Sequence, residues 1–147
     1  LQAEAVAADA LVWPDTRTFD AVLLDAPCTA TGTFRRHPDV LWAARPGDMA
    51  PLAALQSRLL DSAAARTRPG GRLVYCTCSL EGEEGEAQIA AFLRRTPGFR
   101  RAPIAPGEGG APAEAVTADG DLRLLPSMWA EQGGLDGFYI ARLSRAA

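Results

Sequence analysis

Two short apolar runs, separated by a stretch with helical periodicity, constrain the fold of this chain more than any other feature. The first run is FDAVLLD at residues 19–25, and the second is RLVYCTC at residues 72–78. Continuous runs of this length are typical of strands that are buried on both faces, as in parallel sheets. The sequence therefore predicts two strands of one parallel sheet.

The stretch between the two runs predicts a loop and then a helix. Residues 26–47 are rich in Pro, Gly, Thr and Arg, which is typical of a long functional loop. Asp48 is the predicted N-cap of a helix that runs to about Arg66, and Pro69-Gly70-Gly71 ends it. The apolar face of this helix consists of Met49, Leu52, Leu55, Leu59 and Ala63. A strand–helix–strand unit places its two strands parallel, with their carboxyl ends side by side.

The rest of the chain adds a second helix and an antiparallel end. Residues 83–95 form the predicted helix, with acids in its first turn and two arginines in its last. Residues 103–120 are dominated by Pro, Gly and Ala, and we expect a surface excursion there. Residues 122–125 and 138–143 are two further strand candidates, and residues 4–10 are interpreted as the end of another strand. The predicted fold class is α/β, closed by an antiparallel strand pair.

Composition excludes several classes of protein. The chain has 147 residues and a net charge of −3, enough for one globular domain or most of one. It has no apolar run that could span a bilayer and no signal-peptide pattern. Its three cysteines do not resemble a secreted disulfide framework, so we expect a cytoplasmic protein. The acidic balance argues weakly against coating nucleic acid by bulk charge, but it leaves room for a local basic groove.

The carboxyl ends of the two predicted strands carry the candidate chemistry. In an open α/β sheet, ligands bind beyond these ends. Asp25 and Cys28 follow the first strand and Cys78 ends the second, so we expect these three side chains to share one cleft. Cys76 lies one step inside the strand and is predicted to be a small buried hydrophobe. A thiol beside a carboxylate suggests nucleophilic attack on an electron-poor ring, and a helix starting just after Ser79 is the predicted activator of that thiol.

At this point the sequence resembles a known family, the Sun-type RNA (cytosine-5)-methyltransferases of bacterial ribosomal RNA and their nucleolar relatives. The segment DAPCTATG at 25–32, followed by RRHPD at 35–39 and by Trp42, is similar to the family's fourth motif. The segment VYCTCSL at 74–80, followed by EEGE at 83–86, is similar to its sixth motif. LRLLP at 122–126 and GGLDGF at 133–138 resemble its C-terminal strand pair.

The resemblance implies a class I S-adenosylmethionine-dependent methyltransferase fold, Rossmann-like, and an RNA substrate. In that reading Cys78 is the nucleophile that adds to C6 of cytosine, and Cys28 assists release of the covalent product. Asp25 lies at both the cofactor and the base, and Asp9 reads the adenine amino group of the cofactor. The target cytosine must be single-stranded or flipped out. Candidates for RNA phosphate contacts are Arg35, Arg36 and His37.

The sequence also departs from the family pattern. Thr29-Ala30 stands in place of the usual Ser-Gly, a mild change, and Pro126-Ser127 in place of Pro-His. The glycine-rich cofactor loop is absent and is expected before Leu1; Gly107–Gly110 is no substitute, because it does not connect a strand to a helix. We therefore expect residues 1–147 to be the C-terminal portion of one catalytic domain, forming the 4-5-7-6 half of the family's 3-2-1-4-5-7-6 sheet. The strand at 19–25 then becomes an apolar edge, and the isolated chain is expected to bind cofactor weakly or not at all.

Three alternatives stay open on the sequence. A thiol or zinc protein would use all three cysteines, although Cys-x-Cys is a poor redox spacing and no fourth ligand is evident. His37 is the only histidine, so we expect no metal cluster and no histidine-dependent triad. The second alternative is a relative that has lost catalysis and keeps only its RNA-binding surface. A methyltransferase acting on nitrogen or on small molecules would need no nucleophilic cysteine.

Overall fold

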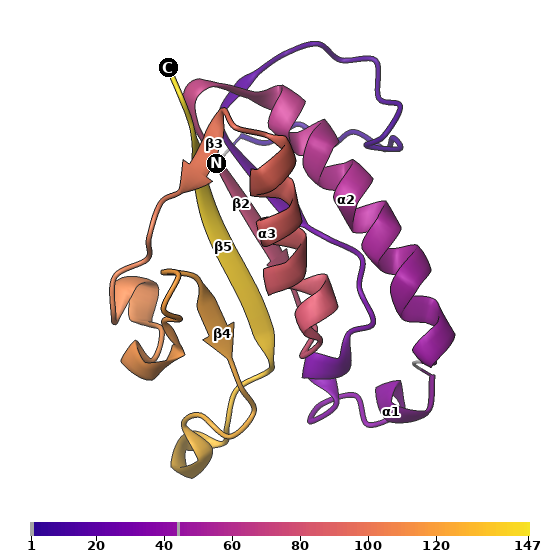
Figure 1. Ribbon diagram of the computed structural model, residues 1–147. Helices are drawn as coiled ribbons and strands as arrows, with labels where there is room; N and C mark the ends of the chain where they lie inside the picture. The colour runs from indigo at the N-terminus through magenta and orange to yellow at the C-terminus, as the bar shows by residue number, and fades with distance from the viewer. Residues whose placement is uncertain (1, 44) are drawn as a thin grey trace.

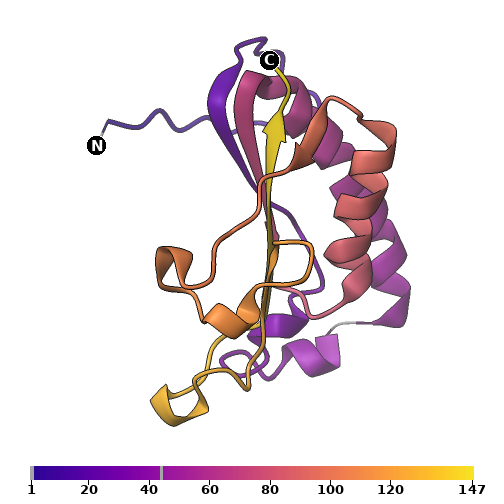
Figure 2. The same cartoon turned by 60° about the vertical axis from the view of Figure 1, so that its left-hand side comes forward.

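A computed structural model describes residues 2–43 and 45–147 as one mixed sheet with two long helices on one side (Figure 1). The sheet contains β1 (Phe19–Asp25), β2 (Thr67–Thr77), β3 (Phe99–Arg101), β4 (Leu122–Leu124) and β5 (Phe138–Arg145). The helices are the short α1 (Val40–Ala43), α2 (Met49–Arg66) and α3 (Glu86–Arg95). Figure 2 shows α2 and α3 together on the same side of the sheet, which is seen there nearly edge-on.

The strand order confirms the predicted half-sheet. β1 pairs with β2 in parallel, and β2 pairs with β5 antiparallel. β3 and β4 both pair antiparallel with the other edge of β5, near its end and near its start respectively. The order is therefore β1-β2-β5-β3, with β4 also on β5. The last position of the predicted order is thus occupied by two short strands, of which β3 was not predicted.

The main core lies between the sheet and the two helices. Alternate residues of β2 and β5 point to it, including Leu73, Tyr75 and Tyr139, which are fully buried. From the helices, Leu60 of α2 and Phe92 of α3 fill the same core. A second, smaller cluster of buried apolar residues lies on the other face of β5; it includes Ile104, Ala115 and Leu122. The segment 103–120, predicted as a surface excursion, thus contributes a few residues to that small core.

Several local predictions were wrong, each for a physical reason. The helix predicted at 83–95 is a short 3-10 turn, Gly82–Glu84, followed by α3, because the backbone at Gly85 (φ −118°, ψ −101°) breaks the helix. Asp48 precedes α2 as predicted, but its carboxylate accepts the backbone N–H of Arg45 at 3.1 Å and so closes the preceding turn. Residues 4–10 contain no strand; this exposed segment has no strand beside it to pair with.

The predictions for the two key strands also need correction. β2 begins at Thr67, earlier than expected, because Thr67 pairs with Phe19 and a register shift accommodates the residues up to Arg72. β1 was predicted to be buried on both faces, but Leu23 is 69% exposed. The cause is that Leu23 shares the face of Val74 and Cys76, which no helix covers within residues 2–43 and 45–147. No helix among residues 2–43 and 45–147 is both long enough and apolar enough to cross a membrane.

Candidate active site

The carboxyl ends of β1 and β2 bring the predicted thiols together. Asp25 is level with Cys76 in the parallel register, and the N–H of Ala26 donates to the carbonyl of Cys76 at 3.0 Å. The chain beyond each strand then turns toward the other. As a result the Sγ atoms of Cys28 and Cys78 lie 3.5 Å apart, although the two residues are 50 positions apart in the sequence.

The third thiol has different surroundings. Cys76 was predicted to be a buried small hydrophobe, but it is half-buried on the face of β2 away from the helices. The reason is that no helix covers that face in the part of the chain that the structure describes. Its Sγ donates to Oδ1 of Asp25 at 3.5 Å. Burial and the charge of Asp25 raise the pKa of Cys76 to about 12, so this thiol stays protonated near neutral pH.

Only one of the paired thiols is poised to ionise. The hydrogen bond between the two sulfurs lowers the pKa of Cys78 to about 7, against the opposing effect of burial. The same hydrogen bond and burial raise the pKa of Cys28 far above its usual range. The predicted activator, a helix starting just after Ser79, is absent, because α3 begins only at Glu86. The neighbouring thiol takes that role.

A buried carboxylate below the Cys28 loop was missed in the sequence. Glu84 is fully buried, and both of its oxygens accept the backbone N–H of Thr29 at 3.1 Å. The Thr29 hydroxyl donates to Oε2 at 2.5 Å, and the Gln56 amide donates to Oε1 at 3.0 Å. The run EGEEGE at 81–86 offers four acids with nothing in the sequence to show which one turns inward. Burial in the folded chain is the only signal that separates Glu84 from the others.

Two glycines fix the loop on its other side. The N–H of Gly32 donates to the carbonyl of Cys78 at 2.9 Å, and the carbonyl of Gly32 accepts the N–H of Gly137 at 2.7 Å. The two backbones approach so closely that a Cβ on Gly32 would lie 2.9 Å from the Cα of Gly137 and would overlap its carbonyl group. This contact, here called the glycine strap, joins the Cys28 loop to the turn before β5.

Ala30, within the same loop, has a left-handed backbone with φ 58°. The sequence departure at this position was predicted to be mild. A left-handed conformation favours glycine, because a Cβ there approaches the following carbonyl oxygen. The alanine therefore carries backbone strain at the centre of the site.

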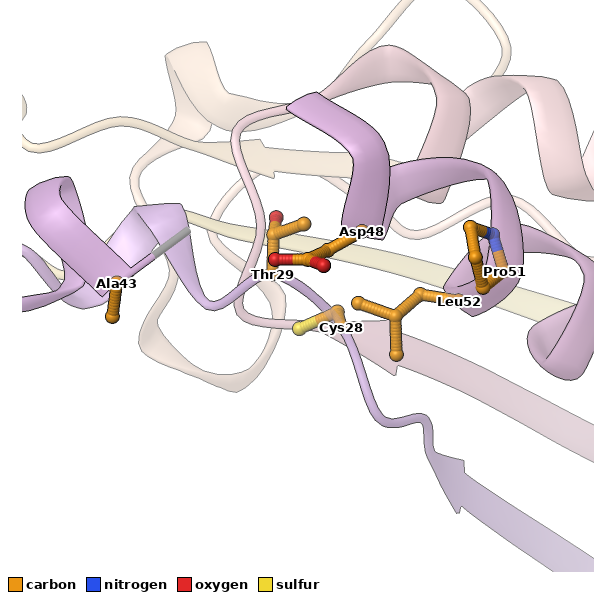
Figure 3. A pocket seen from close by; sticks show the side chains of 6 residues that line it. All are labelled: Cys28, Thr29, Ala43, Asp48, Pro51 and Leu52. Carbon is orange, nitrogen blue, oxygen red and sulfur yellow. The ribbon is translucent and has the colours of Figure 1, made fainter. Parts of the chain in front are cut away.

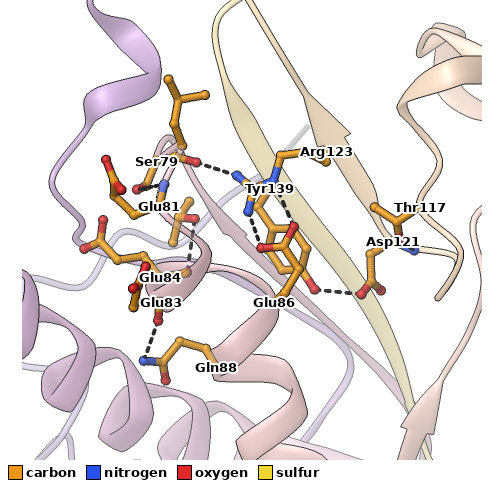
Figure 4. Close-up of polar contacts among 12 residues, drawn as sticks. Ser79, Glu81, Glu83, Glu84, Glu86, Gln88, Thr117, Asp121, Arg123 and Tyr139 are labelled. Carbon is orange, nitrogen blue, oxygen red and sulfur yellow. Dashed lines mark hydrogen bonds and ion pairs between the residues drawn. The ribbon is translucent and has the colours of Figure 1, made fainter.

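The residue after Cys78 is fixed by a cation from β4. Arg123 donates to the carbonyl of Ser79 at 2.7 Å and to Oε1 of Glu86 at 3.0 Å, as the dashed lines in Figure 4 show. Its guanidinium also lies over the Tyr139 ring, 4.9 Å from the centroid. The chain that leaves β2 is thereby held against β4 and α3.

The predicted phosphate-contacting residues lie on an exposed loop. Nε of Arg36 donates to Oδ2 of Asp136 at 2.7 Å, and Arg35 lies 3.5 Å from Oδ1 of the same carboxylate. This pairing raises the pKa of Arg36 and lowers the pKa of Asp136. The side chains of Arg35 and Arg36 are 40% and 55% exposed, so both retain a solvent-facing surface. His37 is exposed as well.

The structure does not bring Asp9 to this site. Asp9 lies in the exposed N-terminal segment, where its carboxylate accepts the N–H of Leu11 at 2.9 Å. Ser62, in the second half of α2, donates to the adjoining carbonyl of Ala10 at 2.7 Å. The Cys28 loop instead contacts the first half of α2, where Gln56 donates to the carbonyl of Pro27 at 2.9 Å. Of the two acids predicted to hold the cofactor, only Asp25 therefore lies beside the thiols.

A hollow beside Cys28 leaves room for a ligand. It has a volume of about 400 Å³ and lies between the Cys28 loop and the start of α2 (Figure 3). Its lining residues are Cys28, Thr29, Ala43, Asp48, Pro51 and Leu52. Within residues 2–43 and 45–147, no group of three or more His, Cys, Asp or Glu side chains is placed to hold a metal ion.

Comparisons with known proteins agree with one another. The sequence model of the family described as 16S rRNA methyltransferase RsmB/F matches residues 2–144. The ribosomal RNA small subunit methyltransferase B of Salmonella arizonae is 48% identical over 131 residues, which cover 89% of this chain and 27% of that protein. The protein of the same name from Pseudomonas syringae pv. tomato is 45% identical over 150 residues, which cover 100% of this chain and 32% of that protein. The chain thus spans about a third or less of the length of these relatives.

A solved structure gives the same result for the fold. The crystal structure of NSun6 from Pyrococcus horikoshii with SFG, an S-adenosylmethionine analogue, superposes with a TM-score of 0.74 at 30% identity. The match covers 97% of this chain and 34% of that one.

Proposed function

Because the chain belongs to the RsmB/F family of 16S rRNA methyltransferases, we propose that it carries the catalytic thiols of an S-adenosylmethionine-dependent RNA (cytosine-5)-methyltransferase. Its sheet is part of the class I methyltransferase fold. The observation that supports the cytosine-5 chemistry is the thiol pair at 3.5 Å. A methyltransferase that acts on an amine needs no nucleophile of its own, whereas C5 of cytosine must first be made electron-rich.

Cys78 is the proposed nucleophile. Its pKa of about 7 leaves a large thiolate fraction at neutral pH. The thiolate adds to C6 of the cytosine, a C6–S bond forms, and the electrons of the C5–C6 double bond become available at C5. S-adenosylmethionine, when bound, supplies the methyl group that C5 takes. C5 then loses its proton to water, the double bond reforms, and the C6–S bond breaks with its electron pair returning to sulfur.

Cys28 and Asp25 assist this sequence in different ways. Cys28 keeps its proton, because its pKa is raised, and it donates that proton in a hydrogen bond to the Cys78 sulfur. The hydrogen bond stabilises the thiolate both before attack and when it leaves the product. Asp25 lies at the end of β1, in contact with Cys76. We propose that its carboxyl group stabilises the proton that N3 takes from water when C6 is attacked and returns to water when the C6–S bond breaks.

The proposed substrate is an unpaired or flipped-out cytosine, since a stacked base cannot reach a thiol at a strand end. Arg35 and Arg36 keep solvent-facing surface while Asp136 holds them, which suits contacts to phosphate oxygens. His37 extends the same exposed loop. Such contacts position the RNA without reading its sequence.

RNA containing 5-fluorocytosine tests the proposed chemistry. A fluorine at C5 cannot leave as a proton, so the protein should stay covalently attached to the RNA. In a longer protein that carries this chain together with a glycine-rich cofactor loop, and with S-adenosylmethionine present, we expect a denaturation-resistant adduct in the wild type and in Cys28→Ala, and none in Cys78→Ala. Denaturing gels and peptide mass mapping measure the adduct and its site. The reverse pattern would assign the nucleophile to Cys28, and a wild-type protein that forms no adduct would overturn the proposed function.

A further inference from the structure

Glu84 is a buried carboxylate that pairs with no cation among the described residues. Its side chain is fully buried, yet it takes part in none of the ion pairs of the structure. Arg123 is a cation from β4 in the same region, and it pairs with Glu86 instead (Figure 4). A buried carboxylate without hydrogen bonds is strongly unfavourable. Glu84 is therefore tolerated because neutral donors surround it.

All of those donors either belong to the loop that carries Cys28 or contact it. The backbone N–H and the hydroxyl of Thr29 both donate to Glu84, directly after Cys28 in the chain. Gln56 donates to Glu84 and also to the carbonyl of Pro27, directly before Cys28. The peptide groups on the two sides of Cys28 are thus fixed by one carboxylate and one amide.

The backbone of Glu84 is tied to the strand that leads to Cys78. The hydroxyl of Tyr75 donates to the Glu84 carbonyl at 2.7 Å, and the hydroxyl of Thr77 donates to the same carbonyl at 3.3 Å. Both residues belong to β2 and both are fully buried. Glu84 therefore links the loop of one thiol to the strand of the other.

We propose that Glu84, assisted by Gln56, is a positioning residue that holds the Cys28 thiol against the Cys78 sulfur and so keeps Cys78 reactive. That the reactivity of Cys78 serves methyl transfer rests on the proposed function. The positioning itself concerns only this chain and requires neither RNA nor cofactor to be observed.

Two effects of Glu84 on Cys78 have opposite signs, which makes the proposal testable. The negative charge of Glu84 by itself raises the pKa of Cys78. Holding Cys28 in place lowers it, because the Cys28 hydrogen bond is the largest cause of the lowered pKa. Removing the charge would therefore lower the pKa of Cys78 if charge were all that Glu84 contributed. Losing the position of Cys28 would raise it.

The experiment is the pH dependence of iodoacetamide alkylation at Cys78, followed by peptide mass mapping. For the wild type we expect a midpoint near pH 7. In Glu84→Gln an amide N–H₂ faces the Thr29 donors, and we expect the midpoint to rise, with a roughly tenfold slower reaction at pH 6 for each unit of rise. Cys28→Ala removes the donor altogether and marks the upper limit of the shift. Glu83→Gln is the matched control, because it removes the same charge from an exposed neighbour and should leave the midpoint unchanged.

A midpoint in Glu84→Gln that is unchanged or lower overturns the proposal. If that variant does not fold, Thr29→Val takes its place. It removes only the hydroxyl donor and keeps the backbone N–H, so the midpoint should rise in the same direction by a smaller amount, and no rise would again overturn the proposal. Since alkylation needs no RNA, this result is independent of the 5-fluorocytosine adduct. An upward shift without any adduct would support the positioning role and contradict the proposed function.

Discussion

At the scale of single residues, Ala30 links backbone strain to the position of the thiols. It lies two residues after Cys28 and adopts φ 58°. A non-glycine residue in this region costs about 1–2 kcal/mol relative to a right-handed conformation. The surrounding hydrogen bonds, at Thr29 before it and at Gly32 after it, keep the residue in this conformation.

Replacing Ala30 by glycine should therefore stabilise the protein. We expect the free energy of unfolding to rise by about 1 kcal/mol, because the relief of strain exceeds the entropy that glycine adds to the unfolded chain. Urea unfolding followed by circular dichroism measures it. Ala54→Gly, at an exposed site within α2, is the control and should lower stability by about as much. Equal losses in both variants would show that the left-handed backbone carries no strain.

The sequence predicted which residues meet at the site but not how they act on one another. The meeting of Cys28 and Cys78 follows from parallel strands, whose carboxyl ends share one edge, and Asp25 lies at the same edge in contact with Cys76. The source of activation does not follow from it, because a contact of 3.5 Å between two thiols depends on the loop conformation. Glu84 was missed for the same reason, since its burial depends on packing that no local pattern reports.

At the scale of elements, the glycine strap ties the Cys28 loop to the start of β5. Gly32 is buried and has backbone of the opposite segment where a side chain would stand. Arg36 and Asp136 pair beside it and join the same two segments. The loop is thus held at two points by a part of the chain that is remote in sequence.

Gly32→Ala should separate these segments. We expect a loss of about 2 kcal/mol or more of unfolding free energy, since the new methyl group overlaps backbone that cannot rotate away. Gly98→Ala is the matched control, because its Cβ would meet nothing within 4 Å. Thermal and urea unfolding of the two variants measure the difference. Similar small losses in both would mean that the two segments can move apart freely.

The sequence predicted long elements better than short ones. α2 ends at Arg66 as expected, because its apolar face and the Pro-Gly-Gly that follows are strong local signals. β3 has only three residues and was not predicted, since its pairing with β5 is set by tertiary contacts. The break at Gly85 also escaped prediction; Arg123 and Tyr139, from distant parts of the chain, occupy the space where a side chain on Gly85 would stand.

At the scale of the whole molecule, the sheet has one open side. β1 pairs only with β2 within residues 2–43 and 45–147, and its Leu23 side chain is 69% exposed. An apolar edge strand with free N–H and C=O groups is a template for pairing with another chain. The sequence predicted this edge through the resemblance and not through hydrophobicity, which indicated a strand buried on both faces.

The edge predicts self-association of this chain at high concentration. Sedimentation velocity over a range of concentrations should show growing oligomers for the wild type. Leu23→Lys should reduce them, because a lysine on an edge strand disfavours pairing. Leu41→Lys is the control, since Leu41 is 60% exposed on α1 and away from the edge. A monomeric wild type, or equal effects of the two lysines, would contradict the prediction.

The glycine strap has a consequence for the order in which the protein is made. Arg36 and Asp136, which pair beside the strap, are 100 positions apart. A ribosome adds about 5–20 residues per second, so about 5–20 s pass between the synthesis of the two ends of that contact. The two thiols are only 50 positions apart and are both synthesised well before Gly137. During translation, therefore, the loop that carries Cys28 is made before the segment at Gly137 that holds it through the glycine strap.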